Sequence, residues 1–218
     1  MSRLYDIFIA NGAWKTILSG LFMTLRISGL SLLLGTILGA GICFLRMQNV
    51  KILRIPAIVY IAILRGTPVL MLLLLLYYGV FARAGMPPFL VASITFALNV
   101  SAHVAELFRV AIEATDHGQA EAARTLGFSR AEAFRLITLP QALRIAKPVY
   151  QSTIVNLIQW TSVVGYVTIT DLTRVINNVS SRTMQPFLVI SVGMLLYLGL
   201  SYLVYGIFAL TKRKEGKK

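Results

Sequence analysis

Five long apolar stretches, separated by polar segments, constrain this chain more than any other feature of its sequence. They cover about residues 16–45, 55–81, 87–112, 148–170 and 186–210. Because a helix rises about 1.5 Å per residue, each stretch is long enough to cross the roughly 30 Å hydrocarbon core of a bilayer. Only 13% of the residues are charged, about half of the ~25% that is typical of soluble domains. We therefore predict an all-α polytopic membrane protein with five transmembrane helices, forming one domain over residues 14–212.

The distribution of basic residues predicts how these helices are oriented. If the C-terminus lies in the cytoplasm, the cytoplasmic segments hold 13 Lys and Arg residues and the opposite side holds five. The positive-inside rule then places the N-terminus outside and the C-terminus inside. Basic loops that face anionic lipid headgroups also account for the net charge of +13. We therefore expect contact with membrane lipids and no nucleic acid partner.

The largest cytoplasmic segment, residues 113–147, is predicted to contain two short helices. Asp116 can cap the first helix, and Gln119 three residues later would complete a capping box. Gly127 suits the left-handed conformation that commonly ends a helix. The first helix is therefore expected to end at this glycine.

The second helix of this segment is predicted to open at a capping box formed by Ser129 and Glu132. It is expected to run to about Thr138, with Pro140 beyond its end. Two helices joined at Gly127 would form a compact projection on the cytoplasmic face. The alternative is an amphipathic loop that lies on the headgroups.

Two strings in this segment resemble the EAA loop of bacterial ABC importer permeases. Glu121-Ala122-Ala123 is followed after three residues by Gly127, and nine residues further on by Ile137-Thr138-Leu139-Pro140. Every defining position of that pattern is matched. The resemblance implies that the segment from 116 to 140 docks on a separate ATPase subunit and couples it to the membrane helices. The coupling residues that it implies are Glu121, Ala122, Ala123, Gly127, Leu139 and Pro140.

Further motifs resemble the polar amino acid permeases, the histidine and glutamine importer group, over about residues 14–210. The motifs are Arg65-Gly66-Thr67-Pro68, Ala105 to Arg109, Pro140 to Arg144, Thr161-Ser162 and Asp171-Leu172-Thr173. The chain departs from that group where Gln159-Trp160 replaces a usual Lys-Asp pair, and where His103 replaces a frequent Tyr. It also carries His117 where a Lys is usual. Because two charges are lost beside Thr161, the usual substrate preference of that group does not follow for this chain. The EAA pattern is unaffected.

Two spans carry stripes of polar residues at the spacing of one helical face. The stripes are Thr95, Asn99, His103 and Glu106 in the third span, and Ser152, Asn156 and Gln159 in the fourth. Such stripes indicate either a water-accessible path or packing by interhelical hydrogen bonds. Two roles remain open for His103, a packing residue and a proton relay. Glu106 is placed to pair with Arg109 one helical turn further on.

Arg65 precedes a Gly-Thr-Pro sequence in the second span. Pro68 removes a backbone donor and is expected to kink or break the helix. Two roles remain open for Arg65: its guanidinium binds a substrate carboxylate, or it pairs structurally with carbonyl groups or with Glu106. The residues predicted along the substrate path are Arg65, Thr67, Asn99, His103, Glu106, Ser152, Asn156, Gln159, Thr161 and Ser162.

The sequence contains no GxxxxGK[ST] phosphate loop. We therefore expect no enzyme activity and no cofactor on this chain, with ATP and Mg bound by a partner subunit. The resemblance implies a permease subunit, in the bacterial cytoplasmic (inner) membrane, of an ATP-driven importer for polar amino acids that works by alternating access. Its implied partners are an ABC ATPase subunit, a second identical or related permease subunit, and an extracytoplasmic amino-acid-binding protein. The alternatives are an ABC permease for another small solute (opine- or cystine-like), a non-transporting membrane partner of the same ATPase, and an ion-coupled carrier.

Overall fold

A computed structural model of the chain describes residues 12–215, with side chains described to residue 210. Regular structure within this range is helical throughout, and it contains no strand. The α-helices are α2 (Ala13–Arg46), α3 (Lys51–Gly66), α4 (Val69–Leu74), α5 (Pro88–Glu113), α6 (His117–Thr125), α7 (Arg130–Ala133), α8 (Leu139–Trp160), α9 (Leu172–Thr183) and α10 (Pro186–Glu215). Two π-helical turns, η2 (Leu75–Val80) and η3 (Phe134–Thr138), and one 3₁₀ helix, η4 (Thr161–Val167), complete them. The basic tail predicted over 212–218 lies outside the described side chains.

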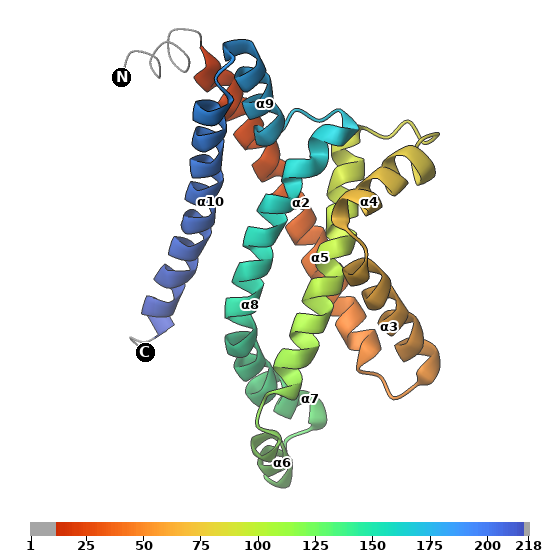
Figure 1. The fold of residues 1–218 in the computed structure, drawn as a ribbon. Coiled ribbons are helices and arrows are strands. Elements are labelled where there is room, and N and C mark those ends of the chain that lie inside the picture. Colours follow the sequence, from red (N-terminus) through yellow and green to blue (C-terminus); the bar gives the residue numbers. More distant parts are fainter. Residues whose placement is uncertain (1–11, 216–218) are drawn as a thin grey trace.

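The long helices α2, α5 and α8 pack together in the middle of the molecule (Figure 1). α10 lies on one side of them, and α3 and α4 lie on the other. α6 and α7 project beyond the bundle at one end, which we call the α6 end. α9 lies at the opposite end, the α9 end, beside the start of α2 and of α10.

Three helices, α2, α5 and α10, are long and apolar enough to cross a membrane. α3 and the α4–η2 segment pass the same test only as a pair, which gives up to four spans among the described residues. α8 has the length but not the apolar composition, since Ser, Asn and Gln side chains occupy one of its faces. The molecule is therefore an all-helical membrane-type protein, and the count of five spans stays a prediction.

The second predicted span is broken where the sequence indicated. α3 and the α4–η2 segment meet at an angle of 107°. Thr67 and Pro68 between them adopt extended backbone conformations, with ψ of 133° and 131°. The residue before a proline is pushed out of the helical region by the proline ring. The break expected from Pro68 is thus confirmed.

Two glycines allow α2 to lie close against α5. Gly35 and Gly39 have the GxxxG spacing, and both face α5. A Cβ atom at Gly35 would lie 2.8 Å from Cβ of Val100, and one at Gly39 would lie 2.8 Å from the Ser101 carbonyl oxygen. Only hydrogen fits at these positions, so the pair serves helix packing within the chain.

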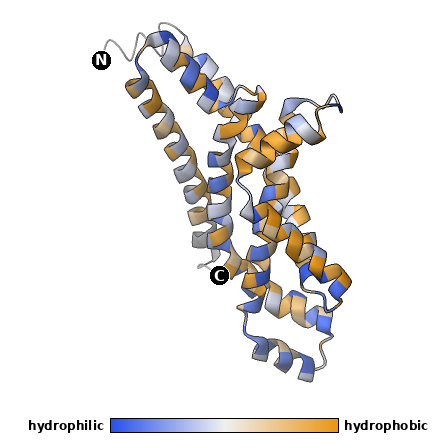
Figure 2. Cartoon of the chain, turned by 45° about the vertical axis from the view of Figure 1, so that its right-hand side comes forward, coloured by the Kyte–Doolittle hydropathy of each residue, from blue (hydrophilic) through white to orange (hydrophobic). Residues whose placement is uncertain are grey.

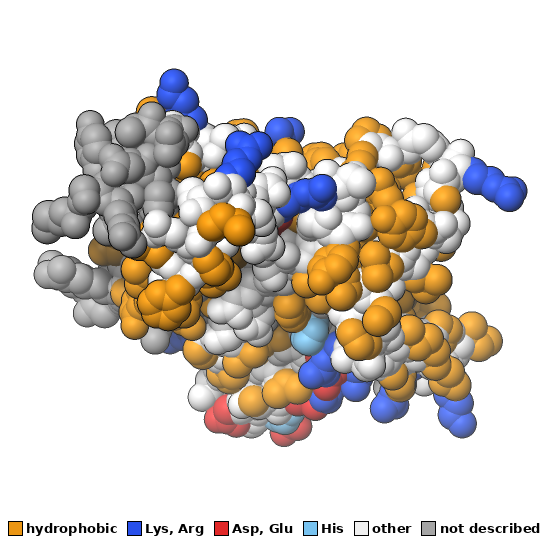
Figure 3. Space-filling view, turned by 45° about the horizontal axis from the view of Figure 1, so that its top comes forward, with side chains coloured by type: hydrophobic (Ala, Val, Ile, Leu, Met, Phe, Trp, Pro, Cys, Tyr) orange, Lys and Arg blue, Asp and Glu red, His pale blue; other side chains and the backbone are white. Residues whose placement is uncertain are grey.

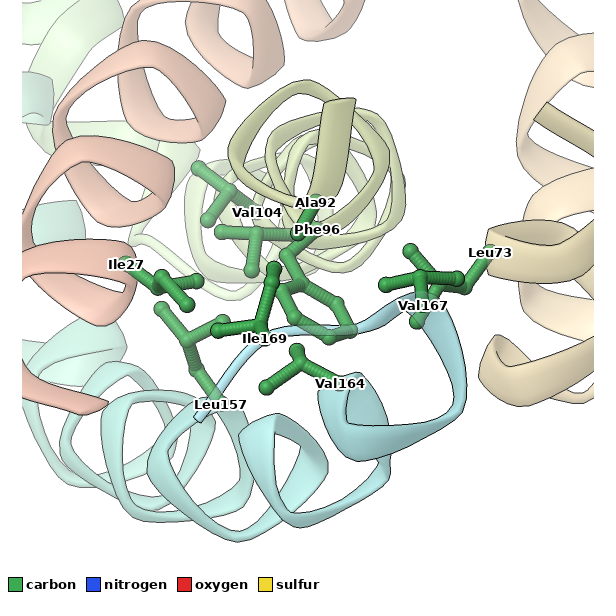
Figure 4. Packing of buried hydrophobic residues seen from close by; sticks show 10 residues of the cluster. Ile27, Leu73, Ala92, Phe96, Val104, Leu157, Val164, Val167 and Ile169 are labelled. Atoms are coloured by element: carbon green, nitrogen blue, oxygen red, sulfur yellow. The ribbon is translucent and has the colours of Figure 1, made fainter. Parts of the chain in front are cut away.

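The main apolar cluster lies where α5 meets α2, α8 and η4 (Figure 4). Phe96 of α5 is fully buried and points toward Leu157 and Val164, with Ile27 and Ile169 beside them. Lipid tails are as apolar as these side chains, so in a bilayer the cluster contributes through van der Waals packing more than through exclusion of water. It fixes the position of α8 against α5.

The surface of the bundle matches a lipid environment. Apolar residues run along the long helices, whereas hydrophilic residues concentrate in α6 (Figure 2). Hydrophobic side chains also cover much of the face shown in Figure 3, with Lys and Arg mostly at its edges. Leu33, Ile37 and Phe44 of α2 are each at least 60% exposed. Such a belt around the bundle indicates the part that contacts lipid.

α9 is an amphipathic helix that the sequence analysis did not predict. Asp171 caps it, accepting hydrogen bonds from the backbone N–H groups of Thr173 (3.0 Å) and Arg174 (3.1 Å). One face, with Leu172, Val175, Ile176 and Val179, is buried against α2 and α10. The N–H of Leu172 also donates to the Thr24 hydroxyl of α2, at 3.3 Å. α9 therefore ties α2 and α10 together at the α9 end.

Candidate functional site

The projection at the α6 end turns at Gly127, as predicted. Gly127 has φ of +95°, in the left-handed region that favours glycine. Its N–H donates to the Arg124 carbonyl at 3.1 Å, and the N–H of Phe128 donates to the Ala123 carbonyl at 3.2 Å. These two bonds form the Schellman motif that ends many helices. α6 and α7 are therefore joined by a defined corner rather than by an irregular loop.

Of the two capping boxes predicted in this segment, one is confirmed and one is wrong. Ser129 and Glu132 form theirs: the Ser129 N–H donates to Glu132 at 2.8 Å, and the Glu132 N–H donates to the Ser129 hydroxyl at 3.3 Å. The Ser129 hydroxyl also donates to the Glu132 carboxylate, at 2.7 Å, and these two donated bonds, first that of the Ser129 N–H, hold the pKa of the Glu132 carboxyl below its usual range. Asp116 does cap α6, through the N–H of Gly118 at 2.9 Å. Gln119 instead accepts a hydrogen bond from Gln141 at 2.8 Å, because the start of α8 folds back beside α6.

The expected helix end at Thr138, with Pro140 beyond it, is also wrong. η3 continues directly into α8, and Pro140 lies at the second residue of α8. The N–H of Leu139 donates to the Phe134 carbonyl, five residues back, so the turn before the proline is widened. A proline ring clashes with the carbonyl four residues before it in a regular helix. The wider π turn allows α7, η3 and α8 to form one continuous helical rod.

The coupling residues that the resemblance implies are placed mostly on the surface of this projection. Glu121, Ala122 and Gly127 are exposed, and Pro140 is exposed at the start of α8. Ala123 is buried between the two short helices, and Leu139 is half-buried. Leu126, beside the corner, has 80% of its surface exposed. Phe128, on the other side of the corner, is exposed as well, and a group of exposed apolar side chains is typical of a contact surface for another protein.

A second group of predicted residues meets at the break between α3 and α4. Because Pro68 has no N–H, the carbonyl of Leu64 four residues earlier has no partner within its helix. Asn99 of α5 supplies it: its Nδ2 donates to the Leu64 oxygen at 3.0 Å. Thr67 caps the same end by donating its hydroxyl to the Ile63 carbonyl at 2.8 Å. Asn99 and Thr67 therefore hold the broken end of α3 against α5.

His103 and Trp160 bring α5 and α8 together one turn further along. Their ring centroids lie 5.3 Å apart with the planes tilted by 39°. Both residues depart from the pattern of the polar amino acid permeases. Arg65 is exposed at the end of α3. Aromatic contact is thus the role that this arrangement gives to His103.

Glu106 is the centre of an ion-pair cluster at the α6 end of α5. Its Oε1 lies 2.7 Å from Nη2 of Arg109, which confirms the predicted pair one helical turn away. Its Oε2 lies 2.5 Å from Nη1 of Arg46, at the end of α2. Arg109 also pairs with Glu113. The alternative in which Arg65 pairs with Glu106 is therefore not what is found, because both oxygens of Glu106 are already engaged.

The polar stripe of α8 lies on the surface of the single chain. Ser152, Asn156 and Gln159 are all exposed. Thr161, by contrast, is fully buried and donates its hydroxyl to the Ile158 carbonyl at 2.7 Å, while Ser162 is half-buried. The stripe thus presents side-chain amides and a hydroxyl on one face of a helix that is flanked by apolar surface.

A family of transport proteins matches most of this chain. The family, described as "Binding-protein-dependent transport system inner membrane component", covers residues 31–215. The chain belongs to this family. It is therefore a permease component of a transport system, and its membrane character follows from the family as well as from its apolar helices.

Individual relatives of this permease agree with that assignment. It is 31% identical over 222 residues to HisM, the histidine/lysine/arginine/ornithine transport system permease protein of Salmonella typhimurium, covering 92% of this chain and 93% of HisM. It is 32% identical over 210 residues to OccM, the octopine transport system permease protein of Rhizobium radiobacter, covering 90% and 86%. A chain of the crystal structure of an amino acid ABC transporter with histidines has a TM-score of 0.85 and 31% identity. That alignment covers 95% of this permease and 98% of the other chain.

One functional residue was missed by the sequence analysis. Arg46 entered it only as one of the basic residues that set the orientation, yet it pairs directly with Glu106. Its position as the last residue of the first apolar helix was the available signal, since a lone carboxylate in the third span needs a cationic neighbour.

Proposed function

We propose that this permease is the membrane-spanning subunit of an ATP-driven ABC importer for amino acids. The family match and relatives named for amino acid and octopine transport support the class of protein. The observation that carries the mechanism is the corner at Gly127, which joins the projecting helices α6 and α7. Helix α7 then continues through η3 into α8. A force on this projection would be transmitted to α8 as a rigid element.

The topology we propose has five spans, with the N-terminus outside and the C-terminus in the cytoplasm of a bacterial inner membrane. The permease domain covers 14–212, and the coupling loop covers 113–147 within it. Support comes from the path of the chain, which passes between the two ends along α2, the α3–α4 pair, α5, α8 and α10 (Figure 1). The excess of Lys and Arg in segments at the α6 end supports a cytoplasmic position for that end.

In this proposal the α6–α7 projection binds a separate ATPase subunit, which holds ATP and Mg. Glu121 offers a charge at the contact and Leu126 an apolar anchor, and both are exposed. α8, with 22 residues, is about 33 Å long at 1.5 Å per residue. Closure of the ATPase would thus move residues at the far end of α8, where Gln159 and Trp160 lie.

The translocation path is proposed to form between two such subunits, identical or related. The exposed polar stripe of Ser152, Asn156 and Gln159 supports this, because a polar face in a lipid-facing position needs water or a second protein. An extracytoplasmic binding protein would deliver the amino acid at the α9 end. Alternation between outward- and inward-open states, biased by nucleotide and by the loaded binding protein, would then drive import.

The test is co-purification of the tagged permease in mild detergent, with the bound proteins identified by mass spectrometry. Wild type is expected to retain an ATPase subunit, and Gly127→Asp to lose it, because an L-residue at φ of +95° distorts the corner. Arg182→Gln, at the exposed surface of α9 at the opposite end, is the matched control and should retain the ATPase. Failure of wild type to retain an ATPase in several detergents would contradict the proposal.

A second candidate is an ABC permease for an opine-like solute, because OccM is an octopine permease at similar identity. ATP-dependent uptake into vesicles that carry the complete system separates the two. Uptake of free amino acids without uptake of octopine supports the first candidate, and the reverse result supports the second.

A further inference from the structure

A cavity of about 630 Å³ lies at the α6 end, between the end of α2, the end of α5 and the start of α8. This volume falls within the range of about 300–1,000 Å³ that is typical of small-molecule sites. We call it the apolar chamber, because hydrophobic side chains form most of its lining; among them are Ala40, Phe44, Met47, Phe108, Phe134 and Leu143. Arg130 is the one charged residue of that lining.

The lining of the apolar chamber is accessible from the surroundings of the chain. Phe44 of α2, Phe134 of η3 and Leu143 of α8 are all exposed. In the topology proposed above, the α6 end lies at the cytoplasmic leaflet, where the acyl chains of the bilayer meet such side chains. The single chain therefore offers an apolar space in which a lipid tail gains van der Waals contacts on several sides.

A second cavity, of about 220 Å³, adjoins the first. Met47, Gln48 and Asn49, the residues that follow α2, line both of them. We call the second cavity the basic chamber, because the charged residues of its lining are three arginines and one glutamate: Arg46, Arg54, Arg109 and Glu113. An apolar space and a basic space therefore lie side by side.

The basic chamber has an excess of positive charge. Arg46 and Arg109 both pair with Glu106, at 2.5 and 2.7 Å, and Arg109 also pairs with Glu113. The side chain of Arg54, exposed in the first turn of α3, takes part in no ion pair or hydrogen bond found among the described residues. An anion in this chamber would therefore be attracted by Arg54, since both carboxylates nearby already have cationic partners.

We propose that the two chambers together bind one anionic phospholipid of the cytoplasmic leaflet. One acyl chain of the lipid fills the apolar chamber, and its phosphate lies in the basic chamber against Arg54. A guanidinium group binds a phosphate through paired N–H donors, and the cytoplasmic leaflet carries anionic headgroups. A zwitterionic lipid with the same chains fits the apolar chamber equally well, but its headgroup brings a cation toward Arg54. The site is therefore selective for a net negative headgroup.

The two chambers lie between the bundle and the proposed coupling loop. Ala40 and Phe44 belong to α2 and Phe108 to α5, whereas Arg130 and Phe134 belong to α7 and η3. A bound lipid contacts both parts at once, so a movement of the coupling loop relative to the bundle changes its fit. We expect occupancy to raise the Tm of the permease, because a ligand that binds only the folded state stabilises it.

Lipid retention tests the proposal on the purified permease, independently of transport. The permease is equilibrated in mild detergent with equimolar phosphatidylglycerol and phosphatidylcholine that carry the same acyl chains, and the bound lipids are counted by native mass spectrometry. Wild type is expected to retain phosphatidylglycerol about fivefold over phosphatidylcholine, the factor that one basic residue contributes beside an anionic headgroup. Phosphatidylglycerol should also raise the Tm of wild type, followed by circular dichroism.

Two substitutions test the basic chamber. Arg54→Gln should lower the preference for phosphatidylglycerol about fivefold. Lys51→Gln, one turn earlier in α3, is the matched control, because it removes the same charge from an exposed residue outside both linings. Asn49→Glu places a carboxylate in the wall that the two chambers share and should lower the preference at least as much as Arg54→Gln.

One substitution tests the apolar chamber. Ala40→Trp places a large side chain in its lining and should abolish the retention of both phospholipids. Leu38→Trp, at an exposed position of the same helix outside the lining, is the control and should retain them. Circular dichroism shows whether each variant is folded, and Arg54→Gln and Asn49→Glu test the site without filling it.

The outcomes that overturn the site are distinct. Equal retention of the two lipids by wild type, or equal loss of preference in Arg54→Gln and Lys51→Gln, would leave only a general attraction to lipid. Displacement of the lipid by glycerol phosphate would assign the basic chamber to a free phosphate compound. Loss of the lipid when the ATPase binds would assign the chambers to that subunit. ATP-driven uptake decides the importer function separately, so failure of either proposal leaves the other standing.

Discussion

Replacing Glu106 with glutamine should destabilise the permease more than any other carboxylate-to-amide change at the α6 end. Glu106→Gln keeps the shape of the side chain and removes its charge, so Arg46 and Arg109 lose their shared partner. The side chain of Glu106 is 19% exposed, and those of Arg46 and Arg109 are 20% and 22% exposed. Removing one partner of a fully buried ion pair costs about 3–5 kcal/mol.

The expected cost here is smaller, for two structural reasons. The three side chains are partly exposed, and Arg109 retains its ion pair with Glu113. We therefore expect a loss of about 2–3 kcal/mol in the free energy of unfolding. For a chain of this length that corresponds to a fall in Tm of about 4–12 °C. The assay is thermal unfolding of the purified permease in detergent, followed by circular dichroism.

A double-mutant cycle shows whether the Arg46 contact carries the effect. Glu106→Gln, Arg46→Gln and the double variant should give a coupling energy of about 1–2 kcal/mol. Glu121→Gln, which changes an exposed carboxylate of α6, is the control for stability and should stay within about 0.5 kcal/mol of wild type. Equal effects of Glu106→Gln and Glu121→Gln, or a coupling energy near zero, would refute the reasoning.

Three further substitutions have defined outcomes. Gly39→Ala places a Cβ atom 2.8 Å from the Ser101 carbonyl oxygen and should cost about 1–3 kcal/mol in thermal unfolding, whereas Gly41→Ala in the same helix meets nothing within 4 Å and should cost nothing. Asn99→Leu leaves the Leu64 carbonyl without its donor and should lower the free energy of unfolding by about 1–3 kcal/mol. Asn156→Leu, on the exposed face of α8, is the control and should lower it by nothing; equal melting curves for the two variants would contradict the role of Asn99. The pKa of the Glu132 carboxyl, measured by NMR, should lie below its ordinary value of 4.5 and should return toward that value in Ser129→Ala. The stabilisation of α7 by the capping box should therefore be complete above the pKa of Glu132 in the unfolded chain, and it should be lost as the pH falls through the lower pKa in the folded chain.

Helices with a strong local signal could be predicted from the sequence. The uninterrupted apolar stretches gave α2, α5 and α10 to within a few residues, and Pro68 gave the break in the second span. α9 was missed because its mean hydropathy is low. Asp171 followed by Leu172, Val175 and Ile176 nevertheless has the cap and the spacing of an amphipathic helix.

The two errors in the coupling segment have one origin. The roles of Pro140 and Gln119 were predicted from their neighbours in sequence, yet both roles depend on how α8 begins and where it packs. Pro140 is accommodated by the π turn η3 and so does not end the helix, and Gln119 is bonded to Gln141 across the fold. The local rule for a proline after a helix assumes that the turn before it is a regular one.

Contacts between helices could not be predicted from one sequence. The pair of Glu106 with Arg109 follows from their spacing, whereas the pair with Arg46 requires α2 and α5 to lie parallel with a known register. The contact between His103 and Trp160 likewise depends on how α8 packs. The departure of both residues from the same family pattern was visible in the sequence, but their proximity was not.

These contacts join the proposed coupling segment to the predicted substrate path. α7, η3 and α8 form one continuous rod that begins at the Gly127 corner and ends at Trp160. Asn99 and the close contact at Gly39 attach α5 to α3 and α2. Because Trp160 contacts His103 of α5, a displacement of α8 relative to α5 would change this contact. If the proposed coupling segment moves α8 in this way, the spacing between His103 and Trp160 changes with the state of the ATPase.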